Sequence, residues 1–264
     1  MVLLKMEKII DKTVLVTGGS RGIGRAIALA LAQQGSKVAF TGRNEKTLQG
    51  LAQEITGLGG RSLPLRCDVS RKEEVERAAV EISEKFGPVQ ILVNNAGMAP
   101  ATGFLEMDDG LWHEVLNVNL NGTYYCCKLF LPSMVAARWG RIINIASTVS
   151  KVAYPRTSAY TASKHAVLGL TRVLALEVAR SGITVNAICP GYVDTELTRD
   201  NIKLMAEKTR RTFEEALKIF QASSPQKRLI EPEEIAHVAL LLASIDSKGI
   251  TGQAVNVDGG AVMI

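Results

Sequence analysis

Cysteine and histidine are scarce in this chain, and their arrangement excludes two classes of site. The 264 residues include four cysteines and three histidines, which are scattered without a CxxC pair or the spacing of a zinc site. We therefore expect no metal site and no disulfide framework, with thiols that stay reduced as in the cytosol. A chain of this length buries enough surface to fold without such crosslinks.

Long apolar runs and dense basic clusters are also missing. The apolar run at residues 1–8 is short and interrupted by charge, which argues against a signal peptide, and no stretch approaches the roughly 20 apolar residues of a membrane span. The net charge of +5 is mild, and no block of Lys and Arg with interleaved aromatic residues suggests nucleic acid. We expect a cytoplasmic protein that binds neither a membrane nor a nucleic acid.

What the sequence does contain is a regular alternation of strand-like and helix-like segments. It predicts an α/β fold: a doubly wound parallel sheet of the Rossmann type with helices on both faces. No linker divides the chain, so we expect a single domain over 1–264. The expected strands are 13–17, 37–41, 61–67, 90–94, 141–146, 183–189 and 254–257. The expected helical segments are 22–34, 45–56, 71–86, 108–137, 158–180, 196–222 and 231–244.

A glycine-rich turn follows the first expected strand, in the run Thr17-Gly18-Gly19-Ser20-Arg21-Gly22-Ile23-Gly24. Glycines there allow a tight turn and let a pyrophosphate approach the backbone. The helix that starts in this run offers free N–H groups and a partial positive charge to an anion. The turn therefore predicts a dinucleotide phosphate site.

The end of the second expected strand predicts which dinucleotide binds. An acidic residue there would accept hydrogen bonds from the ribose 2′-hydroxyl of NAD. The sequence instead reads Phe40-Thr41-Gly42-Arg43, without a carboxylate. Arg43 and Arg21 can bind a 2′-phosphate, so we predict NADP(H) as the cofactor.

Tyr160 and Lys164 stand four residues apart in an expected helix and therefore share one face. A phenol has a pKa of roughly 10; we expect the Lys164 ammonium and an oxidised nicotinamide ring to lower it and make Tyr160 an acid–base group. Ser147 ends the preceding strand and can orient a substrate oxygen. We expect His165 to lie on another helix face and the cysteines to lie in the core.

The TGxxxGxG spacing of the turn resembles the short-chain dehydrogenase/reductase family, and later motifs match in order over nearly the whole chain: Cys67-Asp68-Val69, Asn94-Asn95-Ala96-Gly97, Asn119, Ser147, Tyr160-xxx-Lys164 and Pro190-Gly191 with Thr195. The resemblance implies a catalytic set of Asn119, Ser147, Tyr160 and Lys164, with Asn119 supporting a water-linked proton path. It implies a homotetramer through the tail 250–260. The implied cofactor contacts are Gly18, Ser20, Arg21, Gly22, Ile23, Gly24, Arg43, Asp68, Val69, Asn95, Ala96, Gly97, Tyr160, Lys164, Pro190, Gly191, Val193 and Thr195.

Further sequence resemblances limit the class of substrate that we expect. The runs at 145–148 and 163–165 resemble aromatic-polyketide ketoreductases and 3-oxoacyl-thioester reductases, whereas 186–191 also resembles 3-hydroxybutyrate dehydrogenases. The latter bind a free carboxylate with a Gln, a His and a Lys, where this chain has Ala99, Val149 and Thr157. We therefore predict NADPH-dependent reduction of a 3-oxoacyl thioester or a β-keto, polyketide-like substrate to a secondary alcohol, with the substrate either free or bound to CoA or a carrier protein.

Two alternatives remain: a dehydrogenase of free ketones or alcohols, including a 3-hydroxybutyrate type, and a non-enzymatic cofactor sensor. Segment 196–222 is expected to cover the substrate as a lid. Its basic residues Lys203, Lys208, Arg210 and Arg211 either form a solvated face or meet a carrier phosphate. The residues expected along the substrate chain are Val149, Val152, Tyr154 and Tyr192.

Overall fold

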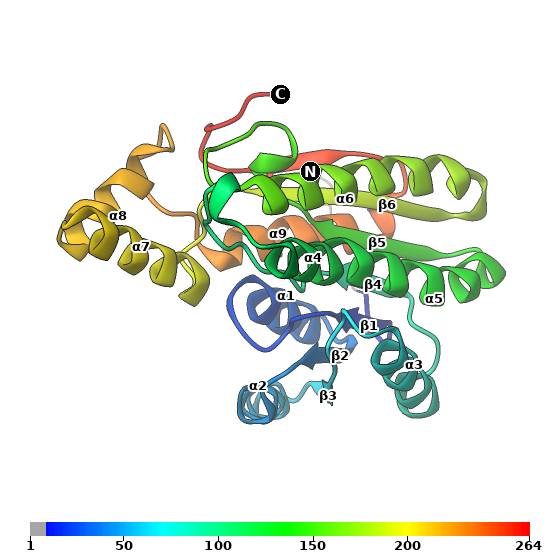
Figure 1. Ribbon diagram of the computed structural model, residues 1–264. Coiled ribbons are helices and arrows are strands. Elements are labelled where there is room, and N and C mark those ends of the chain that lie inside the picture. Colours follow the sequence, from blue (N-terminus) through cyan, green and yellow to red (C-terminus); the bar gives the residue numbers. More distant parts are fainter. Residues whose placement is uncertain (1–8) are drawn as a thin grey trace, which may run out of the picture.

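The computed structural model describes residues 9–264, which form one seven-stranded parallel sheet with helices on both faces (Figure 1). The chain enters at the middle of the sheet, moves outward to one edge, returns to the middle and then moves to the other edge, giving the order β3-β2-β1-β4-β5-β6-β7. The predicted fold class is confirmed. The strands are β1 (Thr13–Val16), β2 (Lys37–Gly42), β3 (Arg61–Arg66), β4 (Ile91–Asn94), β5 (Gly140–Ile145), β6 (Ile183–Pro190) and β7 (Ala254–Val257).

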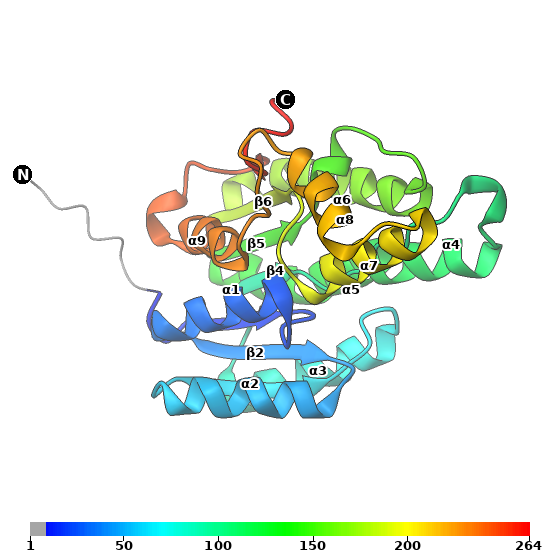
Figure 2. The ribbon, with the colours of Figure 1, turned by 90° about the vertical axis from the view of Figure 1, so that its left-hand side faces the viewer.

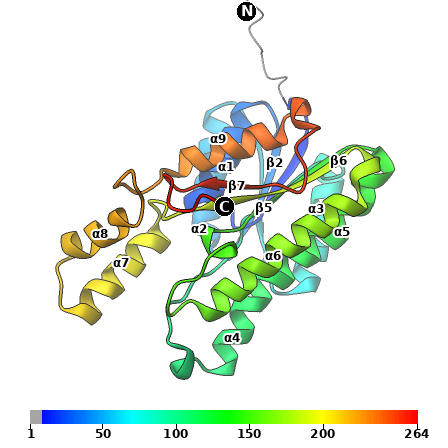
Figure 3. The same ribbon diagram turned by 90° about the horizontal axis from the view of Figure 1, so that it is seen from above.

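Helices cover the sheet in two layers, seen from above in Figure 3. One core lies under α1, α2 and α9, and the other lies under α3, α5 and α6. The helices are α1 (Gly22–Gln33), α2 (Glu45–Gly57), α3 (Lys72–Phe86), α4 (Asp109–Leu116), α5 (Gly122–Ala137), α6 (Ser158–Glu177), α7 (Glu196–Thr209), α8 (Phe213–Ala222) and α9 (Pro232–Ala243).

Strand β1 shows why the sheet is covered on both faces. All four of its residues are buried. Val14 and Val16 pack into the core under α1, α2 and α9, whereas Leu15 between them packs into the opposite core, because successive side chains of a strand point to opposite faces. A strand that is apolar on both faces is typical of a parallel sheet between two helical layers.

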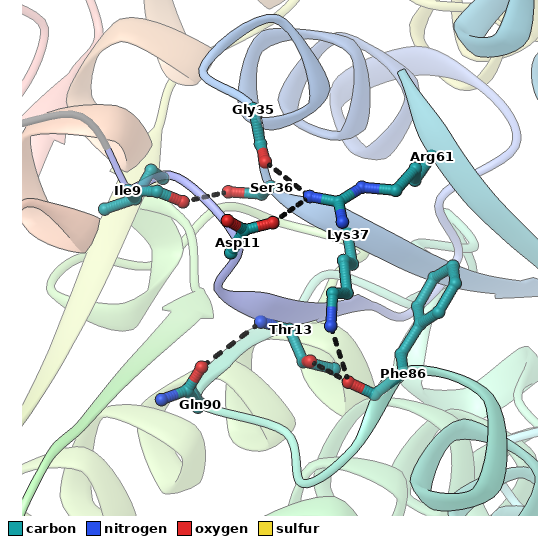
Figure 4. Close-up of polar contacts among 9 residues, drawn as sticks. All are labelled: Ile9, Asp11, Thr13, Gly35, Ser36, Lys37, Arg61, Phe86 and Gln90. Atoms are coloured by element: carbon teal, nitrogen blue, oxygen red, sulfur yellow. Dashed lines mark hydrogen bonds and ion pairs between the residues drawn. The ribbon is translucent and has the colours of Figure 1, made fainter.

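Polar contacts fasten the residues before β1 to the amino ends of β2 and β3 (Figure 4). The Ser36 hydroxyl donates to the carbonyl of Ile9 at 2.8 Å. The Arg61 guanidinium binds the Asp11 carboxylate and also donates to the carbonyl of Gly35 at 3.3 Å. The hydrogen bond to Arg61 and its charge hold the pKa of Asp11 below its ordinary value. These contacts lie at the end of the sheet opposite to the strand ends that carry the predicted site.

Two expected helical segments are divided in the structure. The segment predicted at 108–137 consists of α4, a π-turn at Asn117–Asn121 and α5. The segment predicted at 196–222 is a pair of helices, α7 and α8, separated at Arg210, whose φ of 53° is left-handed. Thr212 and Glu215 then form a capping box that starts α8.

The α7–α8 hairpin extends from one side of the molecule (Figures 1 and 2) and has a small core of its own. Ile202 and Ala206 of α7 pack with Ala216 and Phe220 of α8. The hairpin is therefore held together by its own contacts rather than by insertion into the main cores. Over residues 9–264, no helix is long and apolar enough to cross a bilayer.

A chain of buried polar side chains fixes α6 on the sheet. The Asn94 amide of β4 donates to Asn144 Oδ1 of β5 at 2.8 Å, and the Asn144 amide donates to Thr171 Oγ1 of α6 at 2.8 Å. The Thr171 hydroxyl donates in turn to the carbonyl of Val167 at 2.8 Å. Because α6 carries Tyr160 and Lys164, this chain positions the predicted chemical centre relative to the strands.

We predict that Asn144→Ala lowers the free energy of unfolding by about 1–3 kcal/mol, since it leaves a buried amide donor of Asn94 without its partner. Urea denaturation followed by circular dichroism measures the change. Gln49→Ala removes an exposed amide that bonds Glu45 and serves as the control, with a change within about 0.5 kcal/mol. Equal midpoints for Asn144→Ala and the parent protein would contradict the role given to the buried chain.

Candidate active site

A cavity of about 1500 Å³ opens at the carboxyl ends of the strands. The glycine turn after β1, the segments that follow β2 to β6, and α7 line it. In open parallel sheets, ligands bind where the strand order reverses, which here is between β1 and β4. The predicted site residues line this cavity, with the exception of Gly24, Asn119 and Val152.

Gly24 and Asn95 hold the glycine turn in its conformation. A Cβ on Gly24 would lie 2.4 Å from the carbonyl oxygen of Gly18 and 2.4 Å from the Asn95 amide nitrogen. That amide donates to the carbonyls of Thr17 and Gly18 at 2.9 and 3.0 Å. Gly24 therefore makes room for the turn itself rather than for a ligand, which corrects its predicted place among the cofactor contacts.

The start of α1 suits a phosphate group. Arg21 occupies the N-cap without a capping hydrogen bond, and the first turn of α1 holds no acidic residue. The first N–H groups of a helix have no partner within the helix and attract anions. Gly18 has a φ of 60°, and a Cβ there would lie 2.9 Å from Ala96 Cα, so the turn can pass this close to the end of β4 only with glycine. The residues present thus fit a dinucleotide pyrophosphate.

The end of β2 lies beside this turn. A Cβ on Gly42 would lie 3.0 Å from Ser20 Oγ, and the Thr47 hydroxyl donates to the same oxygen at 3.1 Å. Arg43 is exposed and lines the cavity. It also helps to lower the pKa of Asp68, after two larger effects: burial, which opposes the change, and hydrogen bonds from Ser70.

Arg21 is placed differently from Arg43. Its Nη1 lies 3.6 Å from Oε2 of Glu196, the first residue of α7. Both side chains are exposed and both line the cavity. Arg21 therefore already has an acidic neighbour on the segment predicted to form the lid.

Ser147 and Tyr160 meet inside the cavity. Ser147 follows β5, caps the short turn Thr148–Ser150 and accepts a hydrogen bond from the Val149 N–H at 3.3 Å. The Tyr160 phenol, in the first turn of α6, lines the same cavity, and Ser147 is close enough to it to lower its pKa. Two hydroxyl groups thus stand together at one point of the cavity wall, where both can contact a substrate oxygen.

Lys164 lies one turn further along α6 and is buried. Its Nζ donates to the carbonyl of Ile145 at 2.7 Å and lies 5.8 Å from the centre of the Tyr160 ring. Burial lowers the pKa of Lys164 to about 8. The ammonium is therefore the form present at neutral pH, but it gives up its proton more readily than an exposed lysine.

Lys164 is not among the groups within residues 9–264 that shift the pKa of Tyr160, and its expected effect together with an oxidised nicotinamide stays a prediction. Burial raises the pKa of Tyr160, and Ser147 offsets this only in part. Desolvation disfavours a phenolate, whereas the Lys164 ammonium is directed at a backbone carbonyl. The phenol therefore keeps its proton at neutral pH.

Asn119 lies in the π-turn and is almost completely buried. Its side chain accepts from the Met98 N–H at 2.9 Å and donates to the Met98 carbonyl and to Ser163 Oγ at 2.9 and 3.0 Å. These bonds tie the segment after β4 to α6, directly beside Lys164. The structure therefore places Asn119 behind the cavity wall rather than in it.

The residues predicted along the substrate chain divide into two groups. Val149, Tyr154 and Tyr192 line the cavity, but Val152 does not. The ring of Tyr192 packs against that of Phe220 in α8, with centroids 4.6 Å apart.

Sequence reasoning missed several lining residues. From the α7–α8 hairpin, Leu204, Met205 and Phe220 reach the cavity, and the apolar spacing of this amphipathic pair was the signal that could have indicated them. Arg156 and Glu106 also line it, joined by an ion pair of 2.9 Å, and nothing in the local sequence links these two residues.

Other charges and the thiols are placed as follows. Of the four basic residues noted in segment 196–222, Lys208 lines the cavity, whereas the other three do not and Lys203 pairs with Asp200 at 3.5 Å. His165 is exposed and the four cysteines are buried, free thiols, as predicted. Within residues 9–264, no group of three or more His, Cys, Asp or Glu side chains could hold a metal ion.

Comparison with known proteins agrees with this arrangement. Residues 18–262 match the family model described as enoyl-(acyl carrier protein) reductase. A 3beta-hydroxysteroid dehydrogenase of Mediterraneibacter gnavus is 36% identical, over 97% of this chain and 96% of its own. A D-beta-hydroxybutyrate dehydrogenase of Rhizobium meliloti is 38% identical, over 94% and 98%. A 3-oxoacyl-(acyl-carrier-protein) reductase of Staphylococcus epidermidis is 36% identical, over 96% and 100%.

Among solved structures, a variant actinorhodin polyketide ketoreductase with NADPH superposes with a TM-score of 0.92 at 37% identity, over 95% of this chain and 97% of the other. The similarity thus extends from the glycine turn through the tyrosine and lysine of α6 to the last strand. The chain belongs to the short-chain dehydrogenase/reductase family and is an oxidoreductase that uses a nicotinamide cofactor.

Proposed function

We propose that this protein uses NADPH to reduce a ketone to a secondary alcohol, and that the ketone belongs to a 3-oxoacyl thioester or a related β-keto compound. The observation that carries the proposal is the group of Ser147, Tyr160 and Lys164 in the same cavity as the glycine turn. The similarity to a 3-oxoacyl reductase and to a polyketide ketoreductase supports this substrate class.

In the proposed reaction, Tyr160 acts as the general acid. Its phenol is protonated at neutral pH and can donate that proton to the oxygen of the substrate carbonyl as negative charge develops there. The Ser147 hydroxyl, which lines the cavity beside the phenol, holds the same oxygen. When bound, the reduced nicotinamide supplies the hydride that adds to the carbonyl carbon.

Lys164 is proposed to stabilise the phenolate that remains and then to donate a proton that restores the phenol, after which water reprotonates the Lys164 amine. A pKa of about 8 favours this exchange at neutral pH. Asn119 is proposed as a positioning residue, because it bonds the backbone beside the cavity and Ser163 next to Lys164. The water-linked proton path through Asn119 stays a prediction.

Cofactor choice is proposed to depend on the end of β2. Gly42 stands where a carboxylate would favour NAD, and exposed Arg43 is available for a 2′-phosphate. The NADPH in the structure of the polyketide ketoreductase supports this choice. The other proposed cofactor contacts are those predicted from the sequence, without Gly24.

A dehydrogenase of free ketones or alcohols is the second candidate. The apolar side chains of Leu204, Met205 and Phe220 and the similarity to a hydroxysteroid dehydrogenase favour an apolar substrate without a thioester. A small free acid fits less well, because Ala99, Val149 and Thr157 line the cavity without charge. Retention of both Tyr160 and Lys164 argues against a non-enzymatic sensor.

We further propose that α7 and α8 act as the substrate lid and that the protein is a cytoplasmic homotetramer. Free thiols are typical of a reducing compartment. Exposed apolar side chains on α5 and α6 support an interface between subunits. They are Tyr124, Leu129, Val173 and Leu176.

We predict that Tyr160→Phe lowers kcat by about 10²–10⁴-fold, because the acid is lost while the ring remains. NADPH binding, measured by fluorescence titration, should be unchanged. Tyr125→Phe on α5, outside the cavity lining, is the control and should keep the parent rate. A Tyr160→Phe variant with most of its activity would show that another group delivers the proton.

We predict that Arg43→Gln lowers kcat/KM for NADPH by about 10- to 100-fold, which corresponds to the loss of one charge-assisted hydrogen-bond pair, with little effect on NADH. Adding Gly42→Asp should shift the preference toward NADH. Arg66→Gln, at the exposed end of β3 outside the cavity lining, makes the same charge change as a control. Equal efficiencies of the parent protein with both cofactors would refute the prediction.

We predict that an acetoacetyl thioester is reduced with a much higher kcat/KM than acetoacetate. A carboxylate buried without a partner is strongly disfavoured, whereas a neutral chain gains about 25 cal/mol for each Å² of apolar surface it buries. Steady-state kinetics on both compounds and on a bicyclic ketone test this. Acetoacetate as the best substrate would restore the hydroxybutyrate assignment, and the bicyclic ketone as the best would favour the second candidate.

A further inference from the structure

Glu196 is an acidic residue that lines the cavity. The function proposed above assigns it no role. Glu196 is the first residue of α7, and its carboxylate lies 3.6 Å from the Arg21 guanidinium. Arg21 also lines the cavity and is one of the two arginines assigned to the 2′-phosphate of the cofactor. An acidic group is thus placed beside a cation that is expected to receive an anion.

Packing of the backbone holds Glu196 in this place. Thr195 caps α7 by accepting from the Thr198 N–H at 3.4 Å. The methyl group of Thr195 lies against the glycine turn, where a Cβ on Gly22 would be 3.1 Å from it. The amino ends of α1 and α7 therefore touch, and the side chains next to this contact, Arg21 and Glu196, are kept within reach of each other.

Other charged residues near Arg21 in the described part of the chain do not form an ion pair with it. Asp194 binds Arg199 through two hydrogen bonds of 2.7 and 3.0 Å, so that its carboxylate is occupied. Arg43, the other arginine assigned to the phosphate, helps to lower the pKa of Asp68. Among residues 9–264, the ion pairs found give Arg21 one acidic partner, which is Glu196.

We propose that Glu196 competes with the 2′-phosphate of the cofactor for Arg21 and so weakens the binding of NADPH but not that of NADH. This inference rests on the proposed function. The guanidinium must leave the carboxylate to bind the phosphate in a two-pronged manner, and the carboxylate that remains repels the added negative charge. NADH carries no 2′-phosphate, so Arg21 keeps Glu196 when NADH is bound.

The size of the effect is limited by solvent. Both side chains are largely exposed, at 65% for Arg21 and 71% for Glu196, and exposed ion pairs are weak and screened by salt. Glu196 is therefore a residue that adjusts cofactor specificity rather than one that blocks binding. Glu196 belongs to the first turn of α7, which is part of the proposed lid. Arg21 would therefore bind either the lid, through Glu196, or the 2′-phosphate of the cofactor.

The test is a fluorescence titration of NADPH and NADH with the parent protein and with Glu196→Gln at low ionic strength. We expect the Kd of NADPH to fall by about fivefold and that of NADH to stay constant, with the gain lost at high salt. Asp200→Asn is the matched control: it makes the same charge change on the same helix, at an exposed acid that pairs with Lys203. It should leave both Kd values unchanged.

Two further variants separate this inference from the proposed function. Arg21→Gln should weaken NADPH relative to NADH, and Arg21→Gln with Glu196→Gln should bind NADPH no more tightly than Arg21→Gln alone. If Arg21→Gln behaves as expected but Glu196→Gln changes neither Kd, the competition is refuted and the proposed function stands. If Glu196→Gln changes both Kd values equally, Glu196 acts on the shared phosphates, and the inference is likewise overturned. If Arg21→Gln does not weaken NADPH relative to NADH, the assignment of Arg21 fails as well.

Discussion

The position of helix α6 on the sheet is the constraint on which the rest of the site depends. Buried polar bonds hold it: Asn144 joins Asn94 of β4 to Thr171 of α6, and Lys164 donates to the backbone at the end of β5. Buried polar groups are costly unless they are paired, so these bonds define one arrangement of helix and strand. That arrangement brings the Tyr160 phenol to the Ser147 hydroxyl.

The same burial decides the protonation of the site. Burial among protein atoms raises the pKa of the Tyr160 phenol and lowers that of the Lys164 amine. Both changes favour the uncharged forms. A phenol that holds its proton suits reduction, in which the enzyme must deliver a proton to the substrate. The packing of α6 on the sheet therefore both positions Tyr160 and keeps its phenol protonated.

The α7–α8 hairpin differs from the rest of the molecule in how it is held. It has a separate small core, and it contributes apolar side chains to the cavity as well as an acidic neighbour of Arg21.

The sequence alone determined the fold class, the strands to within a residue or two, and most of the residues expected at the cavity, whereas two expected helical segments are divided in the structure. Those features depend on local patterns and on the rule that parallel strands end at the same edge, so that Gly18, Ser147 and Thr195 had to lie near one another. Tertiary structure decided the rest, because burial and contact distance sum over residues far apart in the chain. The raised pKa of Tyr160, the structural role of Gly24, the withdrawal of Asn119 and Val152 from the cavity wall, and the contact between Arg21 and Glu196 all depend on packing that no local pattern encodes.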